Sequence, residues 1–129
     1  MIRAIRQYGI SILLAATILV LCLMDTTPLP KAPMTNFDKL VHLLMFFAVS
    51  GVAFFESSRY FRRSVSAGFL FVVSFLYPLF FGGLIEVFQE YLSATRSGDL
   101  MDFLYDGIGA FAGFTVCLIL NRYKLSPSR

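Results

Sequence analysis

The chain has 129 residues, of which 57% are hydrophobic and 15% are charged, and its mean hydropathy is +0.74. Soluble globular domains are about 45–50% apolar and about 25% charged, so this composition does not fit a water-soluble fold. It also excludes a disordered chain, a nucleic-acid-binding tail and a small disulfide-rich scaffold, because each of those needs more charge or more cysteines. We therefore expect a single all-α membrane domain over residues 1–129, with membrane lipids rather than nucleic acid as its surroundings.

Four apolar segments are candidates for membrane spans, and they cover residues 8–24, 40–55, 65–85 and 103–120. A helix needs about 20 residues to cross a hydrocarbon core of about 30 Å, and in lipid it satisfies its own backbone hydrogen bonds. The first and third segments are long enough by themselves to cross the membrane. The second and fourth reach the required length only if the polar residues at their ends are counted as part of the helix. The sequence predicts a bundle of four transmembrane helices, with a kink at Pro78 in the third.

The first segment also has the basic start of a secretory signal peptide. Its apolar run is longer than the usual ~7–15 residues, and no small-x-small cleavage pattern follows Met24. We expect this segment to be retained as a span.

The cations predict the orientation of the bundle. With four spans, one side of the membrane holds both termini and the second connection, and it carries most of the basic residues: Arg3, Arg6, Arg59, Arg62, Arg63, Arg122, Lys124 and Arg129. The other side carries Lys31, Lys39 and Arg96. Because Lys and Arg accumulate on the cytoplasmic side, both termini are expected in the cytoplasm.

Polar residues collect at the outer level of three segments. The nine candidate site residues are Asp38, Lys39 and His42 at the start of the second span, Glu86 and Gln89 at the end of the third, and Arg96, Asp99, Asp102 and Asp106 at the start of the fourth. The spacing places Asp38 and His42 on one helical face, Glu86 and Gln89 on another, and Asp99, Asp102 and Asp106 on a third. Ionisable residues inside spans normally face the bundle interior and mark function, so this spacing predicts an outward-facing polar pocket.

A structural explanation of the same residues stays open. The acids can form a polar network that clamps the helix ends, with Asp99 as an N-cap and Lys39 and Arg96 as counter-ions. Convergence of three separate segments favours the functional interpretation.

His42 is the only histidine, and three roles are open to it: a proton relay, a metal ligand, or an imidazole oriented by a carboxylate. Zinc favours several His or Cys ligands, whereas an oxygen-rich set with one imidazole suits Mg, Mn or Ca better. No cofactor is predicted, and a divalent cation is retained as an alternative.

Small residues predict close helix packing. Gly109 and Gly113 form a G-x-x-x-G pair in the fourth span, and Gly82 lies one turn before Glu86 in the third. We interpret these glycines as a seam between the third and fourth spans.

Residues 37–113 resemble the VanZ-like membrane proteins of bacteria. The resemblance is carried by Asp38-Lys39-x-x-His42, Glu86-x-x-Gln89, Arg96-Ser97-x-Asp99-x-x-Asp102 and Gly109-Ala110-x-x-Gly113. It implies a multi-pass protein of the cytoplasmic (inner) membrane, in the cell envelope, associated with resistance to the glycopeptide antibiotic teicoplanin. Asp106 departs from the pattern, because the family usually carries an asparagine there.

Three functions are compatible with these residues. The first is a non-enzymatic envelope protein whose pocket binds a lipid-linked or amine-bearing envelope molecule, since an acidic site suits a cation. The second is a metal-assisted hydrolase or transferase acting on a lipid head group, with Asp38 and His42 as base and orienting group. A proton-coupled carrier is the third and ranks last. Without a recognised nucleophile motif, binding is favoured over catalysis.

Overall fold

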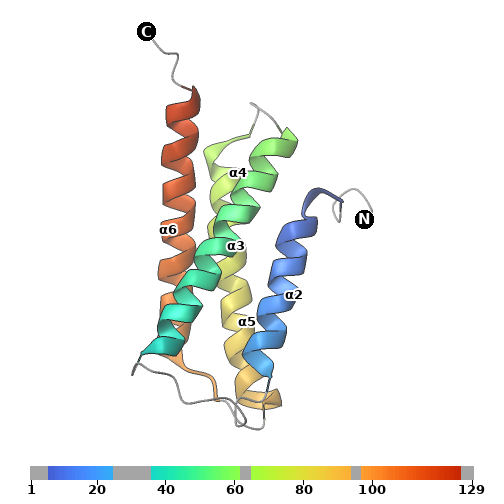
Figure 1. Cartoon of the computed structure of the whole chain (residues 1–129), viewed down its shortest axis with the longest axis vertical. Coiled ribbons are helices and arrows are strands. Elements are labelled where there is room, and N and C mark those ends of the chain that lie inside the picture. The colour runs from blue at the N-terminus through green and yellow to red at the C-terminus, as the bar shows by residue number, and fades with distance from the viewer. Residues whose placement is uncertain (1–5, 25–35, 62–64, 94–96, 126–129) are drawn as a thin grey trace.

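The structure is a computed structural model that describes residues 6–24, 36–61, 65–93 and 97–125. Its elements are α2 (Gly9–Leu23), α3 (Phe37–Phe61), α4 (Ala67–Phe71), the π-helical segment η2 (Val72–Leu76), α5 (Tyr77–Leu92) and α6 (Leu100–Leu125). α4, η2 and α5 follow one another as one interrupted rod beside α3 and α6 (Figure 1). The expected all-α bundle is confirmed.

Among the described residues, three helices are long and apolar enough to cross a membrane, so the chain is a multi-pass membrane protein. They cover Phe37–Arg59, Ala67–Leu92 and Leu100–Tyr123. The expectation of four full spans is wrong by one, because α2 has only 15 residues. At about 1.5 Å per residue, α2 is about 22 Å long and falls short of a hydrocarbon core of about 30 Å.

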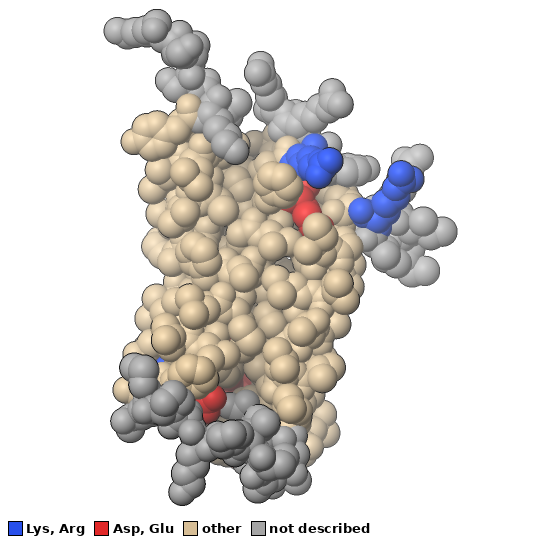
Figure 2. All heavy atoms as spheres, in the orientation of Figure 1, with Lys and Arg blue, Asp and Glu red and all other residues tan. Residues whose placement is uncertain are grey.

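The described surface is apolar between two polar ends. On the face shown in Figure 2, the middle of the bundle is a broad belt of uncharged residues, and charged residues lie only near the two ends. Large hydrophobic side chains such as Phe80 (65% exposed) and Leu13 (68% exposed) point outward from this belt. Such surface is costly in water, whereas lipid tails accept it. α2 begins, and α6 ends, at the same end of the bundle (Figure 1).

The most extensive helix contact joins α3 and α6. A Cβ atom added at Gly109 would collide with the carbonyl of Leu43, and one added at Gly113 would lie 2.6 Å from the carbonyl oxygen of Phe47. These glycines therefore let the backbones of α3 and α6 approach. The seam predicted between the third and fourth spans thus lies between the second and fourth for Gly109 and Gly113, whereas Gly82 of the third span does face the fourth, at Asp106.

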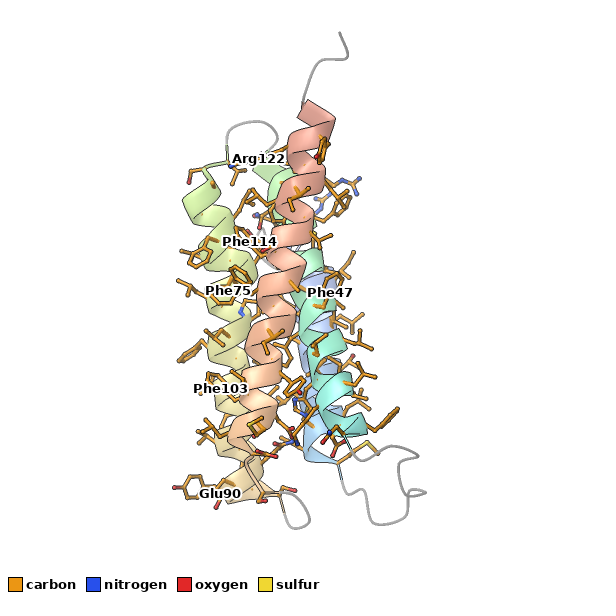
Figure 3. The ribbon with its side chains drawn as sticks, turned by 90° about the vertical axis from the view of Figure 1, so that its left-hand side faces the viewer. Phe47, Phe75, Glu90, Phe103, Phe114 and Arg122 are labelled. Atoms are coloured by element: carbon orange, nitrogen blue, oxygen red, sulfur yellow. The ribbon has the colours of Figure 1, made fainter. Side chains whose placement is uncertain are left out.

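Aromatic rings fill the half of the bundle away from the α5–α6 connection. The ring of Phe114 packs against Phe54 and Phe71, with ring centroids 6.1 and 5.5 Å apart. Phe75 packs edge-on against Phe111 at 5.5 Å, and Figure 3 shows Phe75 and Phe114 on the two neighbouring helices. Rings at such distances bury large apolar areas in preferred geometries, so they hold this half of the bundle together.

The expected irregularity at Pro78 takes the form of a π-helical turn. Pro78 is buried in the first turn of α5, directly after η2. Proline has no N–H, so position 78 donates no helical hydrogen bond. Just before it, the Tyr77 N–H bonds to the carbonyl of Val72, five residues earlier, which is the π-helical pattern.

The start of α2 is held by a carboxylate from α3. Glu56 Oε1 accepts a hydrogen bond from the Ile10 N–H at 3.0 Å, and Oε2 accepts from the Ser11 N–H at 3.1 Å and the Ser11 hydroxyl at 2.6 Å. The first N–H groups of a helix lack partners within the helix, so this carboxylate satisfies them from a neighbouring element.

Candidate functional site

Six of the predicted site residues come together where α3 and α6 begin and α5 ends. We call them the polar cluster: Lys39, His42, Glu86, Asp99, Asp102 and Asp106. Each has a polar atom between 2.7 and 3.8 Å from a polar atom of another member. The cluster grades from the partly exposed Asp99 to the fully buried Asp106.

The buried base of the cluster is a histidine–carboxylate pair. Nδ1 of His42 lies 2.9 Å from Oδ1 of Asp106, and Nε2 of His42 lies 3.8 Å from Oδ2 of Asp102. His42 is 1% exposed and Asp106 is 0% exposed. The two side chains meet because close approach of α3 and α6 at the glycine seam brings their facing turns together.

The partly exposed side of the polar cluster is an ion-pair network centred on Lys39. Its ammonium lies 3.4 Å from Asp99 Oδ2 and 3.7 Å from Asp102 Oδ1. The Lys39 side chain is 23% exposed, which leaves it reachable from water. The predicted role of Lys39 as a counter-ion fits this geometry.

Glu86 ties the end of α5 to the start of α6. Its Oε2 accepts a hydrogen bond of 2.7 Å from the backbone N–H of Asp99. Asp99 in turn caps α6, since its Oδ1 accepts a hydrogen bond of 2.8 Å from the Met101 N–H. That hydrogen bond, helped by Lys39, holds the pKa of the Asp99 carboxyl below its usual value. The expected N-cap role of Asp99 is confirmed.

Four buried polar atoms of the cluster have no hydrogen-bond partner in the described part of the chain. They are His42 Nε2, Glu86 Oε1, Asp102 Oδ1 and Asp106 Oδ2. Buried polar groups in native proteins are nearly always paired. Two of the four still have a charged neighbour, since Asp102 Oδ1 lies 3.7 Å from the Lys39 ammonium and His42 Nε2 lies 3.8 Å from Asp102 Oδ2.

Three predicted site residues lie apart from the cluster or outside the description. Asp38 is exposed at the start of α3. Gln89 is buried, but its side-chain amide donates a hydrogen bond of 2.9 Å to the carbonyl of Cys22, so it binds α2. Arg96 lies outside the described residues. Glu90, also at this end of the bundle (Figure 3), is exposed and accepts a hydrogen bond from the Gly98 N–H.

One residue important to the cluster was interpreted only as a packing glycine. A Cβ atom at Gly82 would lie 2.7 Å from Oδ2 of Asp106 and 3.2 Å from Phe46. Gly82 therefore makes room on α5 for a carboxylate of α6. The sequence signal was the spacing of Gly82 one turn before Glu86, which places both on the same face of α5.

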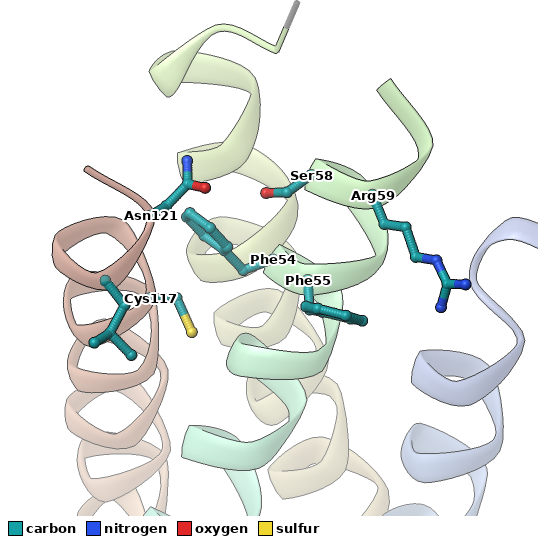
Figure 4. Close-up of a pocket in the computed structure, with 7 residues that line it drawn as sticks. Phe54, Phe55, Ser58, Arg59, Cys117 and Asn121 are labelled. Atoms are coloured by element: carbon teal, nitrogen blue, oxygen red, sulfur yellow. The ribbon is translucent and has the colours of Figure 1, made fainter. Parts of the chain in front are cut away.

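Three cavities lie elsewhere on the described surface. One of about 470 Å³ opens between α3 and α6 near their far ends, lined by Phe54, Phe55, Ser58, Arg59, Cys117, Leu120 and Asn121 (Figure 4). Two others, of about 670 and 490 Å³, adjoin α2. The cavities of about 470 and 490 Å³ are lined mainly by apolar side chains. The cavity of about 670 Å³ has Arg6, Arg59 and Glu56 in its wall, but Glu56 is its only acid and already caps α2.

Comparison of the chain with family models, curated proteins and solved structures found no match.

Proposed function

We propose that this protein is a VanZ-like integral protein of the bacterial cytoplasmic membrane, which binds the polar head group of a lipid-linked or amine-bearing envelope molecule in its polar cluster. The proposal includes a role in resistance to teicoplanin. Its support is the motif resemblance over residues 37–113 together with the placement of the motif residues: the polar blocks of three segments supply the members of one cluster.

The net negative charge of the polar cluster favours a positively charged ligand. Four carboxyl groups face one lysine and one histidine, and Lys39 already contacts two of the acids. The unpaired atoms of Glu86, Asp102 and Asp106 are carboxylate oxygens, which accept hydrogen bonds and attract cations. An ammonium-bearing head group supplies both a positive charge and several N–H donors. A phosphate group would be repelled by the negative charge of these carboxylates.

The proposal requires that the polar cluster face the outside of the cell. The basic residues described at the other end of the bundle, including Arg6, Arg59 and Arg122, favour a cytoplasmic position for that end. A fluorescent-protein fusion after Arg129 is expected to fluoresce, and alkaline phosphatase inserted after Ser97 is expected to be active. The reverse pattern would place the cluster in the cytoplasm and reject an external ligand.

Gentle purification tests the binding function directly. We expect mass spectrometry of the protein in mild detergent to detect a co-purifying amine-bearing or lipid-linked molecule, and the double substitution Glu86→Gln with Asp102→Asn to reduce its amount by about tenfold or more. The scale follows from the loss of two charge-assisted contacts of about 1.5–3 kcal/mol each. Glu90→Gln is the matched control, because this exposed acid lies at the same end but outside the cluster.

Two outcomes contradict the binding function. One is the same set of bound molecules in the wild-type protein and the double variant. The other is a cell expressing the double variant with teicoplanin susceptibility equal to that of the wild-type strain, provided that the wild-type protein lowers susceptibility.

A membrane hydrolase or transferase acting on a lipid head group is the second candidate. The observation that favours it is the His42–Asp106 pair, because a carboxylate that orients an imidazole is a common arrangement of a general base. Turnover of a labelled lipid head group that disappears in His42→Gln, while head-group binding persists, would select this function over binding alone.

A further inference from the structure

A cavity of about 670 Å³ lies between the start of α2 and the last turns of α3, at the end of the bundle away from the polar cluster. Two arginines line it from the two sides: Arg6 lies just before α2, and Arg59 belongs to α3. Figure 4 shows the Arg59 side chain extending from α3 toward α2. The volume is within the range of about 300–1,000 Å³ that is usual for ligand sites. The cavity therefore has room for a ligand beside two cations.

Neither arginine has a partner in the described part of the chain. The ion pairs found there all involve Lys39 or His42, and neither guanidinium takes part in a hydrogen bond. Glu56 is the only acid of the cavity wall, it is 9% exposed, and both its oxygens accept hydrogen bonds from the start of α2. Two positive charges thus line the cavity with one acid that is already bonded, so the cavity favours an anion.

Gln7 adds an unused hydrogen-bond donor to the same wall. Its Nε2 is buried without a hydrogen-bond partner among the described residues. A guanidinium group presents a planar fork of N–H donors that matches the oxygens of a phosphate, and a side-chain amide offers two further N–H donors. A phosphate has more acceptor oxygens than a carboxylate, so it suits three donor groups better.

The cavity wall changes from charged to apolar with depth in the membrane. The hydrogen bond between Glu56 and the Ile10 N–H places these two residues at one level. Arg59 lies about one turn beyond Glu56, and Arg6 about one turn before Ile10, so both are nearer the membrane surface. Leu13 lies about one turn deeper than Ile10, lines the same cavity and is 68% exposed. This order matches a ligand with an anionic head and an apolar tail.

We propose that this cavity binds one anionic phospholipid, with its phosphate between Arg6 and Arg59 and an acyl chain along Leu13 and Phe55. Phe55 is 60% exposed and lines the cavity beside Glu56. Basic pockets between membrane helices bind acidic lipid head groups on the cytoplasmic side, which is where the cations of this chain are expected. The site lies apart from the polar cluster and goes beyond the proposed function. The lipid would join the start of the short helix α2 to α3.

Lipid titration in detergent tests the site. Purified protein in a neutral detergent is titrated with phosphatidylglycerol, and the lipid-bound protein is measured by native mass spectrometry. We expect one tightly bound lipid per chain, and Arg6→Gln and Arg59→Gln should each weaken its binding by about fivefold, the scale for one basic residue near acidic lipid. Both arginines are exposed, so neither substitution removes packed core.

Arg122→Gln is the matched control, because this exposed arginine of α6 lies at the same end of the bundle but outside the cavity wall. In detergent no charged bilayer surface acts on the protein, so a general loss of positive charge should leave lipid binding as in the wild type. Wild-type affinity in both Arg6→Gln and Arg59→Gln overturns the site, and so does an equal loss of affinity in Arg122→Gln.

Other occupants of the cavity give different results. Phosphatidylcholine carries the same phosphate with a compensating ammonium group, so it should bind at least about fivefold more weakly than phosphatidylglycerol. Glycerol 3-phosphate has the phosphate without acyl chains and should not displace the lipid at equal concentration. Equal binding of the two lipids overturns the choice of an anionic head group, and displacement by glycerol 3-phosphate shows a site for free phosphate instead.

Amide hydrogen exchange tests the position of the lipid independently of its affinity. Because the lipid would join α2 to α3, saturating phosphatidylglycerol should slow exchange at Ile10 and Ser11 in the wild type but not in Arg59→Gln. Unchanged exchange at saturation overturns this position. Neither experiment involves the polar cluster, so the lipid site and the proposed function succeed or fail separately.

Discussion

Nδ1 of His42 lies 2.9 Å from Oδ1 of Asp106, although the two residues are 64 positions apart in the chain. The pair joins α3 to α6 at a point with almost no exposure to solvent. In such surroundings a hydrogen bond is stronger than in water, and a group that loses its partner is correspondingly costly. The pair therefore serves stability and site geometry together.

Asp106→Asn is expected to fold as the wild type does, because an amide can accept a hydrogen bond from Nδ1 of His42 or donate one to it, whichever tautomer the ring adopts. Asp106→Leu leaves Nδ1 of His42 buried without a hydrogen-bond partner and should lower the free energy of unfolding by about 1–3 kcal/mol relative to Asp106→Asn. Unfolding in mixed micelles with increasing SDS measures the difference. Equal stability of the two variants would show that the hydrogen bond contributes little.

Gly109→Ala is expected to separate α3 from α6, because the new methyl group collides with the carbonyl of Leu43. Overpacking of this kind costs about 1–3 kcal/mol, which SDS titration detects. Gly51→Ala is the matched control in the same helix pair, since its Cβ would make an ordinary 3.7 Å contact with Cys117 Sγ. A result in which both variants unfold alike would argue against the glycine seam.

Glu56→Ala is expected to loosen the start of α2. The substitution removes the acceptor for the Ile10 and Ser11 N–H groups, and loss of a helix cap costs about 0.5–2 kcal/mol. Amide hydrogen exchange at these two residues should accelerate more than exchange in α6. Glu90→Ala, at the other end of the bundle, should leave exchange in α2 unchanged.

The stability contributed by Asp99 should depend on pH. Its pKa in the folded protein is lowered below the ordinary 3.8, chiefly by the hydrogen bond from the Met101 N–H and also by Lys39. A carboxyl group with a lowered pKa stabilises the folded state above its unfolded pKa, and this contribution disappears as the pH falls through the folded pKa. Asp99→Asn should therefore lower the melting temperature at pH 6 more than at pH 3. A melting difference that is the same at both values would contradict this assignment.

Much of the fold followed from composition and periodicity. Long apolar runs in a chain with few charges have no stable state but a membrane helix, because backbone groups in lipid must be paired within the segment. The length of α2 could not be predicted from composition and periodicity. Its apolar run from Tyr8 to Met24 contains a full span of residues, but the regular helix covers only Gly9–Leu23. Where a helix begins depends on capping groups such as Glu56, which come from another part of the chain.

The sequence alone also determined which residue types stand at the polar end of each segment, since helical spacing places Asp102 and Asp106 on one face. It indicated that three groups reach one level of the bundle. Only the tertiary structure decided the partners: His42 meets Asp106 of α6, Gln89 turns to α2, and Gly109 packs on α3 rather than α5. The physical reason is that periodicity fixes the direction of a side chain within its own helix. The rotation and neighbours of that helix are set by how all the surfaces pack at once.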